Sequence, residues 1–262
     1  MSIKSILRNR VSRAGFLVTE VIDPEVVNAL LRKLHPVETN YDLIRVGGAA
    51  DGGYLLPDDL DGIVACFSPG VDVVATFESD MVARGIKCFL ADASVEAAPL
   101  HHPLIDFEPL FVGGRDDGNV IRLETWIERK LPGIDGDLLL QMDIEGSEWA
   151  TLLSTPPDVL RRFRIIVIEL HHLSRIFDAF GIDVIQAVLL RLLDDFHLVH
   201  IHPNNNVGIV SNSDNFVSDV VEITFLRKDR SPAFGFVKEL PHRLDRDCIP
   251  SKPHVARALM AK

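Results

Sequence analysis

The sequence predicts an α/β fold in which helices cover both faces of a doubly wound, mostly parallel β-sheet. The first observation is that short apolar runs alternate with amphipathic stretches from residue 63 to residue 195, as in strand–helix–strand units. The second is that no clear helical pattern separates the last two apolar runs, 197–202 and 217–226. These two runs predict a closing antiparallel pair, with 217–226 as an edge strand.

Residues 1–40 are predicted to form a helical extension. Asp23-Pro24-Glu25 is typical of a helix start, because Asp is a favoured N-cap and Pro is tolerated in the first turn. Apolar residues then follow at helical spacing, namely Val26, Val27, Leu30, Leu31 and Leu34. His35-Pro36 is expected to end this helix, and the glycine-rich residues 44–59 are expected to be irregular.

Strands and helices are expected to alternate after this stretch. The predicted strands are 63–67, 87–91, part of 105–112, 138–142 and 165–170, and the predicted helices are 74–84, 122–131, one from about 147, and 182–195. Most of the strand runs are apolar throughout, as in strands that are buried on both faces. We therefore expect one domain over residues 41–229, with residues 230–262 as a tail packed on it.

Composition excludes several classes of protein. The chain has 262 residues, a net charge of −11 and a pI near 5.3, so no nucleic-acid partner is expected, since such binding needs basic surfaces. Three well-separated cysteines indicate reduced thiols and a cytoplasmic location. No apolar run reaches the roughly 18 residues of a membrane-spanning helix. The composition does not decide between a monomer and a homo-oligomer.

The first residues allow two interpretations. Basic and apolar residues interleave over residues 3–13, with Lys4, Arg8, Arg10 and Arg13 as the basic members. This spacing is typical of a basic amphipathic helix that makes a peripheral contact with a membrane or a partner. The alternative is a terminal helix packed on the body of the protein.

Ionisable side chains follow three of the predicted strands. The strand at 138–142 is followed by Asp143 and Glu145, the strand at 165–170 contains Glu169 and precedes His171, and the run at 197–202 contains His200 and His202. Side chains at neighbouring strand ends converge on the ligand crevice of an open α/β sheet. They suit a divalent cation, or a His general base held by a carboxylate. The alternative is that the histidines bind loop backbone groups. Glu148, in the first turn of a helix, is explained by the helix dipole.

Two further strand ends supply candidate ligand contacts. Ser68-Pro69-Gly70 is a turn of small residues after the first strand, where the backbone could approach a ligand closely. Asp92 follows the second strand, where an acidic residue commonly binds ribose hydroxyls. The alternatives are a generic turn and an Asp that caps a turn. The GxGxxG pattern of dinucleotide-binding proteins is missing, which argues against a Rossmann oxidoreductase.

Together these motifs resemble those of the FkbM-like class I methyltransferases, which use S-adenosylmethionine. The matching segments are DGGY (51–54), SPGV followed by FE (68–78), Asp92, DIEGSEW (143–149), ELHH (169–172) and HxHxNNN (200–206). DIEGSEW is the most specific of them, and the resemblance covers about residues 44–226. It implies a Rossmann-like fold of the class I type with an antiparallel last strand.

The resemblance also implies roles for individual residues. Ser68, Pro69, Gly70 and Glu78 would lie along the methionine end of the donor, and Asp92 would hold its ribose. Gly53 and Tyr54 would close over the donor. Asp143 and Glu145 would lie beneath the transferred methyl group and the acceptor. Members of this family commonly methylate oxygen, often on sugars, glycans or glycolipids.

The resulting hypothesis is an S-adenosylmethionine-dependent O-methyltransferase acting on a sugar or glycan hydroxyl. Two routes would remove the hydroxyl proton. His171 would act as a general base oriented by Glu169 or Asp143, or Asp143, Glu169 and His202 would hold Mg²⁺ or Mn²⁺. The alternatives are a metal-dependent hydrolase using the same cluster and a non-catalytic binding domain.

Overall fold

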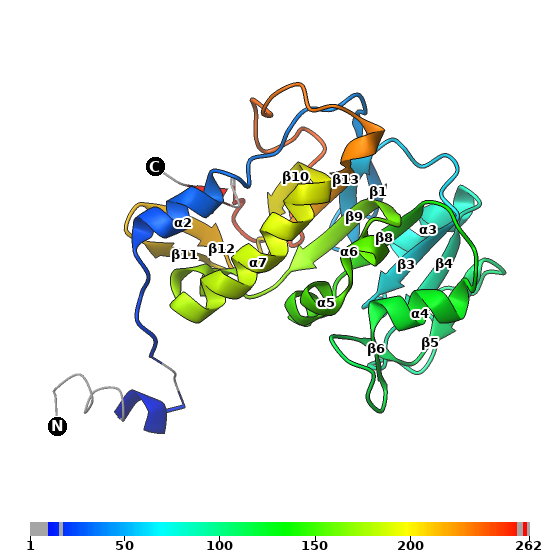
Figure 1. Ribbon diagram of the computed structural model, residues 1–262, viewed down its shortest axis with the longest axis horizontal. Coiled ribbons are helices and arrows are strands. Elements are labelled where there is room, and N and C mark those ends of the chain that lie inside the picture. Colours follow the sequence, from blue (N-terminus) through cyan, green and yellow to red (C-terminus); the bar gives the residue numbers. More distant parts are fainter. Residues whose placement is uncertain (1–9, 16–17, 256–258, 261–262) are drawn as a thin grey trace.

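The computed structural model describes residues 10–15, 18–255 and 259–260 (Figure 1). Its centre is a seven-stranded sheet in the order β10-β13-β9-β8-β3-β4-β5. The strands are β3 (Ala65–Pro69), β4 (Lys87–Ala91), β5 (Ile105–Glu108), β8 (Leu138–Met142), β9 (Phe163–Leu170), β10 (Phe196–Pro203) and β13 (Val221–Arg227). Strands β5, β4, β3, β8 and β9 are parallel, and β13 is antiparallel to both of its neighbours. The predicted fold class, a doubly wound, mostly parallel sheet, is confirmed.

Two apolar cores lie on opposite faces of this sheet. One face is covered by α2 (Pro24–Leu31), α4 (Leu123–Lys130), α5 (Glu148–Ser154) and α7 (Ala179–Asp195), and the other by α3 (Thr76–Ala83) and a hairpin of β1 (Leu43–Gly47) and β2 (Gly53–Pro57). Neighbouring residues of β3 show the division, since Phe67 packs in the first core and Cys66 in the second. Side chains alternate between faces along a strand, so a wholly apolar run supplies both cores.

Short elements complete the described chain. They are α6 (Pro157–Leu160), the 3-10 helices η1 (Leu173–Phe177) and η2 (Lys228–Arg230), the strand pair β6 (Phe111–Val112) and β7 (Val120–Ile121), and a small sheet of β11 (Ile209–Asn212), β12 (Asn215–Ser218) and β14 (Leu259–Met260). The small sheet lies beside α2, far from β5 (Figure 1).

The hairpin occupies residues that we expected to be irregular. Its two strands pair in register from Leu43↔Pro57 to Gly47↔Gly53. The Arg45 side chain closes the intervening loop by donating to the carbonyls of Gly48 (2.7 Å) and Ala50 (3.0 Å). The glycines therefore belong to the turn, while the flanking residues form strands. Thr224 Oγ1 donates to the Leu55 carbonyl at 2.6 Å and so joins the hairpin to the central sheet.

The predicted strand 217–226 is divided into two. Residues 215–218 belong to β12 of the small sheet, and β13 starts only at Val221. Asp219, between them, is held by η1, because its carbonyl accepts from Leu173 N (2.9 Å) and its carboxylate from Ser174 N (3.0 Å). The expected edge position is also wrong, since β13 lies between β9 and β10, and β10 is at the edge.

The N-terminal region follows the predicted cap but not the predicted end. Asp23 accepts a hydrogen bond from Glu25 N at 3.0 Å, as expected of an N-cap. Helix α2 ends at Leu31, before His35-Pro36, because the chain leaves the helix through a turn at residues 32–33. The basic amphipathic helix predicted over residues 3–13 falls largely outside the described residues. Among the described residues, no helix has the length and apolar character needed to cross a membrane.

Candidate active site

A cavity of about 560 Å³ opens at the carboxyl ends of β3, β4 and β8. Gly70 follows β3, Asp92 follows β4 and Asp143 follows β8, and all three line it. Helix α3 contributes Phe77 and Glu78, and the β1–β2 hairpin contributes Asp51, Gly52 and Tyr54. The ends of β3, β4 and β8 therefore form one crevice, as expected. The candidate residues of β9 and β10 do not line it, namely Glu169, His171, His200 and His202.

Gly70 allows the ends of β3 and β8 to meet. Its φ angle is +84°, and a Cβ atom added to it would lie 1.4 Å from the Asp143 carbonyl oxygen. Its N–H donates to the Ala91 carbonyl at 3.0 Å, and Asp143 N donates to the Pro69 carbonyl at 3.2 Å. Only glycine fits this position, because its neighbours are backbone atoms that cannot move aside.

Ser68 lies behind the cavity wall. It is fully buried and, like Pro69 and Gly53, is not one of the residues that line the cavity. Its hydroxyl is hydrogen-bonded to Glu78 and to Gln141 Oε1 (2.6 Å), two side chains that do reach the cavity. Burial raises the pKa of Glu78. Ser68 thus holds two lining residues in place and does not itself face the cavity.

The position of Asp92 in the sequence allowed two roles, a ligand contact in the cavity and a cap of a turn, and its place in the structure is compatible with both. It lines the cavity, and its oxygens also accept from Asp72 N (2.9 Å), Ser94 N (2.8 Å) and Ser94 Oγ (2.7 Å). The side chain is buried, and these bonds hold the loops after β3 and β4 together. Each carboxylate oxygen has more than one acceptor site, so Asp92 retains capacity for a ligand.

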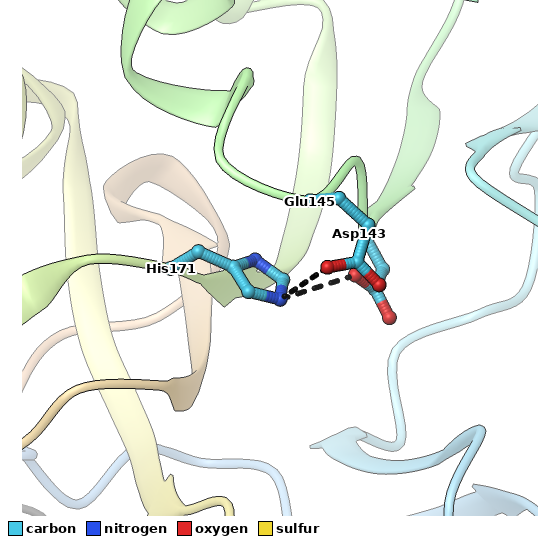
Figure 2. Close-up of side chains that lie close together, drawn as sticks. All are labelled: Asp143, Glu145 and His171. Atoms are coloured by element: carbon cyan, nitrogen blue, oxygen red, sulfur yellow. Dashed lines mark ion pairs between the residues drawn. The ribbon is translucent and has the colours of Figure 1, made fainter. Parts of the chain in front are cut away.

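Two of the lining residues, Asp143 and Glu145, belong to a cluster of ionisable side chains (Figure 2). His171 Nε2, after β9, is 3.9 Å from Asp143 Oδ1 and 3.5 Å from Glu145 Oε2. Glu169 Oε1, within β9, is also 3.9 Å from this nitrogen. The side chain of Glu145 is 88% exposed, whereas that of His171 is 12% exposed. The cluster therefore joins buried groups to a solvent-facing carboxylate.

Glu148 orients the His171 ring from behind. His171 Nδ1 lies 3.1 Å from Glu148 Oε1, which also accepts from Ile144 N (3.0 Å) and Gly146 N (3.2 Å). Trp149 Nε1 donates to the His171 carbonyl at 2.7 Å. Sequence reasoning assigned Glu148 only to the helix dipole. The signal that it missed is the pairing of DIEGSEW with ELHH across adjacent strands β8 and β9.

The cluster has strongly perturbed proton affinities. Burial, and next the charge of Glu169, raise the pKa of Asp143 to about 8. Burial raises the pKa of Glu169 to about 7, although Asn204 Nδ2 donates to it at 2.8 Å. Burial alone would lower the pKa of His171, but the bond with Glu148 and the nearby carboxylates outweigh it and raise the pKa to about 9. Such shifts are typical of functional sites.

The HxHxNNN motif mostly binds the C-terminal tail. His200 Nε2 is 2.8 Å from Asp245 Oδ1, and His202 Nδ1 is 3.3 Å from Asp245 Oδ2. Asn205 accepts from Ile249 N (2.9 Å) and donates to its carbonyl (2.9 Å). Strand β13 separates the strand of His202 from that of Glu169. The structure therefore does not bring His202 together with Asp143.

The Asp245 contacts predict pH-dependent stability. Burial opposes ionisation of Asp245, but its close contacts with His200 and His202 prevail and hold its pKa well below the usual value. In return, Asp245 outweighs the effect of burial on His202 and raises the pKa of that histidine. The stability contributed by ionised Asp245 is lost as pH falls below about 4, and the stability contributed by protonated His202 is lost as pH rises above about 6.5. These contacts therefore stabilise the folded protein most between these two pH values.

We expect Asp245→Asn to lower the free energy of unfolding by about 2 kcal/mol at pH 5.5 and by less at pH 8.5. Urea unfolding at both pH values measures this. An equal loss at both would show that the charge on the pair contributes nothing.

The sheet order, the antiparallel β13 and the cavity across the carboxyl ends of the parallel strands define a methyltransferase fold of the Rossmann-like type. The family model "Methyltransferase FkbM domain" matches residues 85–198, a segment that contains Asp92, Asp143 and His171. Over this segment the chain is therefore similar to FkbM methyltransferases, and this similarity supports a methyltransferase. A comparison with curated proteins gives no match.

Proposed function

We propose that this protein transfers a methyl group from S-adenosylmethionine to a hydroxyl of a sugar, glycan or glycolipid. The observation that carries the proposal is the charge of the cavity. Six lining residues are acidic, namely Asp51, Asp72, Glu78, Asp92, Asp143 and Glu145. Within the part of the chain that the structure describes, no lysine, arginine or histidine lines the cavity. The donor has a net positive charge from its sulfonium and ammonium groups, so such a cavity favours it over anionic ligands.

The residues suggest how the donor lies. Asp92 would bind the ribose hydroxyls, and Gly70 would let the backbone approach the donor closely. Tyr54 and Phe77 meet edge to face, with ring centroids 5.9 Å apart, and both line the cavity. The methyl group would then point toward Asp143 at the other end. The aromatic pair gives the apolar part of the donor a rigid surface.

The reaction needs alignment and removal of a proton. The acceptor oxygen bonds to the methyl carbon, the carbon–sulfur bond breaks, and its electron pair stays on sulfur. The hydroxyl proton leaves to a carboxylate of the cluster, or with the help of a divalent cation bound there. His171, with a pKa of about 9, holds a proton at neutral pH and so positions carboxylates better than it accepts a proton. Alignment alone contributes several kcal/mol.

Location and partners are part of the proposal. Three free, buried cysteines suit a reducing compartment, so we place the protein in the cytoplasm. The net charge of −11 argues against a nucleic-acid acceptor. A polyhydroxyl acceptor suits the polar lining residues Asp51 and Glu145.

Donor binding is tested with S-adenosylhomocysteine by calorimetry. We expect micromolar affinity for the native protein and a loss of about ten- to a hundredfold in Asp92→Asn, because a carboxylate–hydroxyl bond is lost. Asp183→Asn, an exposed position on α7, is the matched control. A 2′,3′-dideoxyribose analogue should bind both Asp92 forms almost equally.

Two outcomes would contradict this assignment. Absence of nucleoside binding would overturn the methyltransferase proposal in favour of a hydrolase acting through the same cluster. Equal affinity of native protein and Asp92→Asn for S-adenosylhomocysteine would remove Asp92 from the ribose site.

A further inference from the structure

We propose that Asp143, Glu145 and His171 bind a divalent metal ion. One ligand atom from each residue lies within 4.8 Å of the others. Figure 2 shows the two carboxylates, which follow β8, and His171 Nε2, which follows β9, pointing toward one another. The role given to the ion rests on the proposed function, because the ion would serve the acceptor hydroxyl, but the site itself is defined by its ligand atoms.

The distances suit ligands that share an ion. His171 Nε2 lies 3.5 Å from Glu145 Oε2 and 3.9 Å from Asp143 Oδ1. Both exceed the 2.7–3.2 Å of an ordinary hydrogen bond. Two atoms that bind one metal ion at about 2.1 Å are about 3.0–4.2 Å apart, depending on the angle between them. The space between these side chains therefore matches an ion better than a shared proton.

The second nitrogen of His171 is arranged as in metal-binding histidines. Glu148 Oε1 accepts from two backbone N–H groups, at 3.0 and 3.2 Å, and its side chain has no exposed surface. It is therefore an acceptor, and His171 Nδ1 carries the hydrogen of the 3.1 Å contact. Metal-ligating histidines usually donate their other N–H to a carboxylate in this way. Nε2 then faces Asp143 and Glu145, and a metal ion bound there would displace the proton from this nitrogen.

Buried carboxylate oxygens without a donor point independently to a cation. Within the described part of the chain, Asp143 Oδ1 and Glu169 Oε2 are buried and have no hydrogen-bond partner. The Glu169 side chain is only 5% exposed, and its other oxygen lies 3.9 Å from His171 Nε2. Unpaired buried carboxylates are costly unless a charge compensates them. The single positive charge of one imidazole does not compensate the negative charges of these carboxylates, whereas a divalent ion would.

The ligand set indicates the kind of ion. Carboxylates suit Mg²⁺ and Mn²⁺, whereas an imidazole favours transition metals, so we expect Mn²⁺ to bind more tightly than Mg²⁺. Glu145 faces solvent, which leaves coordination positions for an acceptor. The ion would supply Lewis acidity that lowers the pKa of a hydroxyl beside it. Of the three metal ligands predicted from the sequence, only Asp143 belongs to this proposed site. Glu169 lies beside the site, and His202 lies beside Asp245 instead. Glu145 and His171 are the two additional ligands.

Binding of Mn²⁺ alone tests the site. Metal-stripped full-length protein is titrated with MnCl₂ by calorimetry and by electron paramagnetic resonance, without donor. We expect one site in the native protein and at least about a tenfold weaker affinity in Glu145→Gln. Because Glu145 is exposed, this variant should fold normally. Asp92→Asn, a carboxylate elsewhere in the cavity, is the matched control and should bind Mn²⁺ like the native protein.

The outcomes separate this proposal from the proposed function. Absence of a Mn²⁺ site, or equal affinity in Glu145→Gln and native protein, would overturn the metal site. If S-adenosylhomocysteine still bound in that case, the methyltransferase proposal would stand and a carboxylate would take the proton. The metal proposal is supported if Glu145→Gln loses Mn²⁺ affinity but keeps its affinity for S-adenosylhomocysteine. Asp92→Asn should keep Mn²⁺ affinity and lose affinity for S-adenosylhomocysteine.

Discussion

Asp143→Asn is expected to reduce methyl transfer by at least about a thousandfold, because proton removal and electrostatic stabilisation both depend on this carboxylate. Asparagine has nearly the same shape, so the cavity should stay intact. The ionisable group that lies 3.9 Å from His171 Nε2 and faces the expected methyl position is replaced by an amide that cannot accept the proton. Affinity for S-adenosylhomocysteine should change by less than about threefold, since the loss belongs to the transition state.

The measurement is transfer of a labelled methyl group to a panel of neutral glycosides, followed by kinetics on the one that turns over with the native protein. Asp183→Asn is the matched control, as an exposed aspartate on α7. Near-native turnover in Asp143→Asn would remove Asp143 from the reaction and leave Glu169 as the candidate proton acceptor. Loss of nucleoside affinity would instead indicate a damaged cavity.

Gly70→Ala is expected to abolish donor binding and to destabilise the protein. The added Cβ would lie 1.4 Å from the Asp143 carbonyl oxygen and 2.5 Å from its carbonyl carbon. One strand end must therefore move, which displaces the turn after β3 and the backbone that carries Asp143. We expect S-adenosylhomocysteine affinity to fall at least about a hundredfold and the free energy of unfolding to fall by about 3 kcal/mol, from overpacking and positive φ together.

Gly85→Ala separates the two causes of this loss. Gly85 has a similar φ of +79°, but a Cβ there meets no atom within 4 Å. It should cost only about 1 kcal/mol, from backbone conformation, and leave nucleoside affinity unchanged. Calorimetry and urea unfolding on both variants measure the difference. Equal behaviour of the two variants would show that contact between the ends of β3 and β8 has no role in donor binding.

Among the strands buried on both faces, β4 and β8 match their predicted bounds, whereas β3 (predicted 63–67) and β9 (predicted 165–170) differ by two residues. β4 and β8 have the predicted bounds, 87–91 and 138–142, because an uninterrupted apolar run bounded by polar residues has few other structures available. Helix α7 begins at Ala179, earlier than the predicted residue 182, because Asp178 caps it by accepting from Gly181 N at 2.8 Å. Local patterns therefore fix element type better than element ends.

Elements that depend on a distant partner were not predictable. The β1–β2 hairpin is held on the central sheet by Thr224, which donates to the Leu55 carbonyl. The division of 217–226 depends on η1 binding Asp219. These contacts join segments far apart along the chain, and periodicity carries no information about them.

The sequence by itself determined the fold class and which strand ends carry Asp92, Asp143, Glu169 and His171, since apolar runs and the residues that follow them are local features. Only the tertiary structure decided how those side chains pair. Glu148 holds His171, and Asp245 holds His200 and His202. The physical reason is that strand order and the path of the tail set these distances, and both arise from packing of the whole chain.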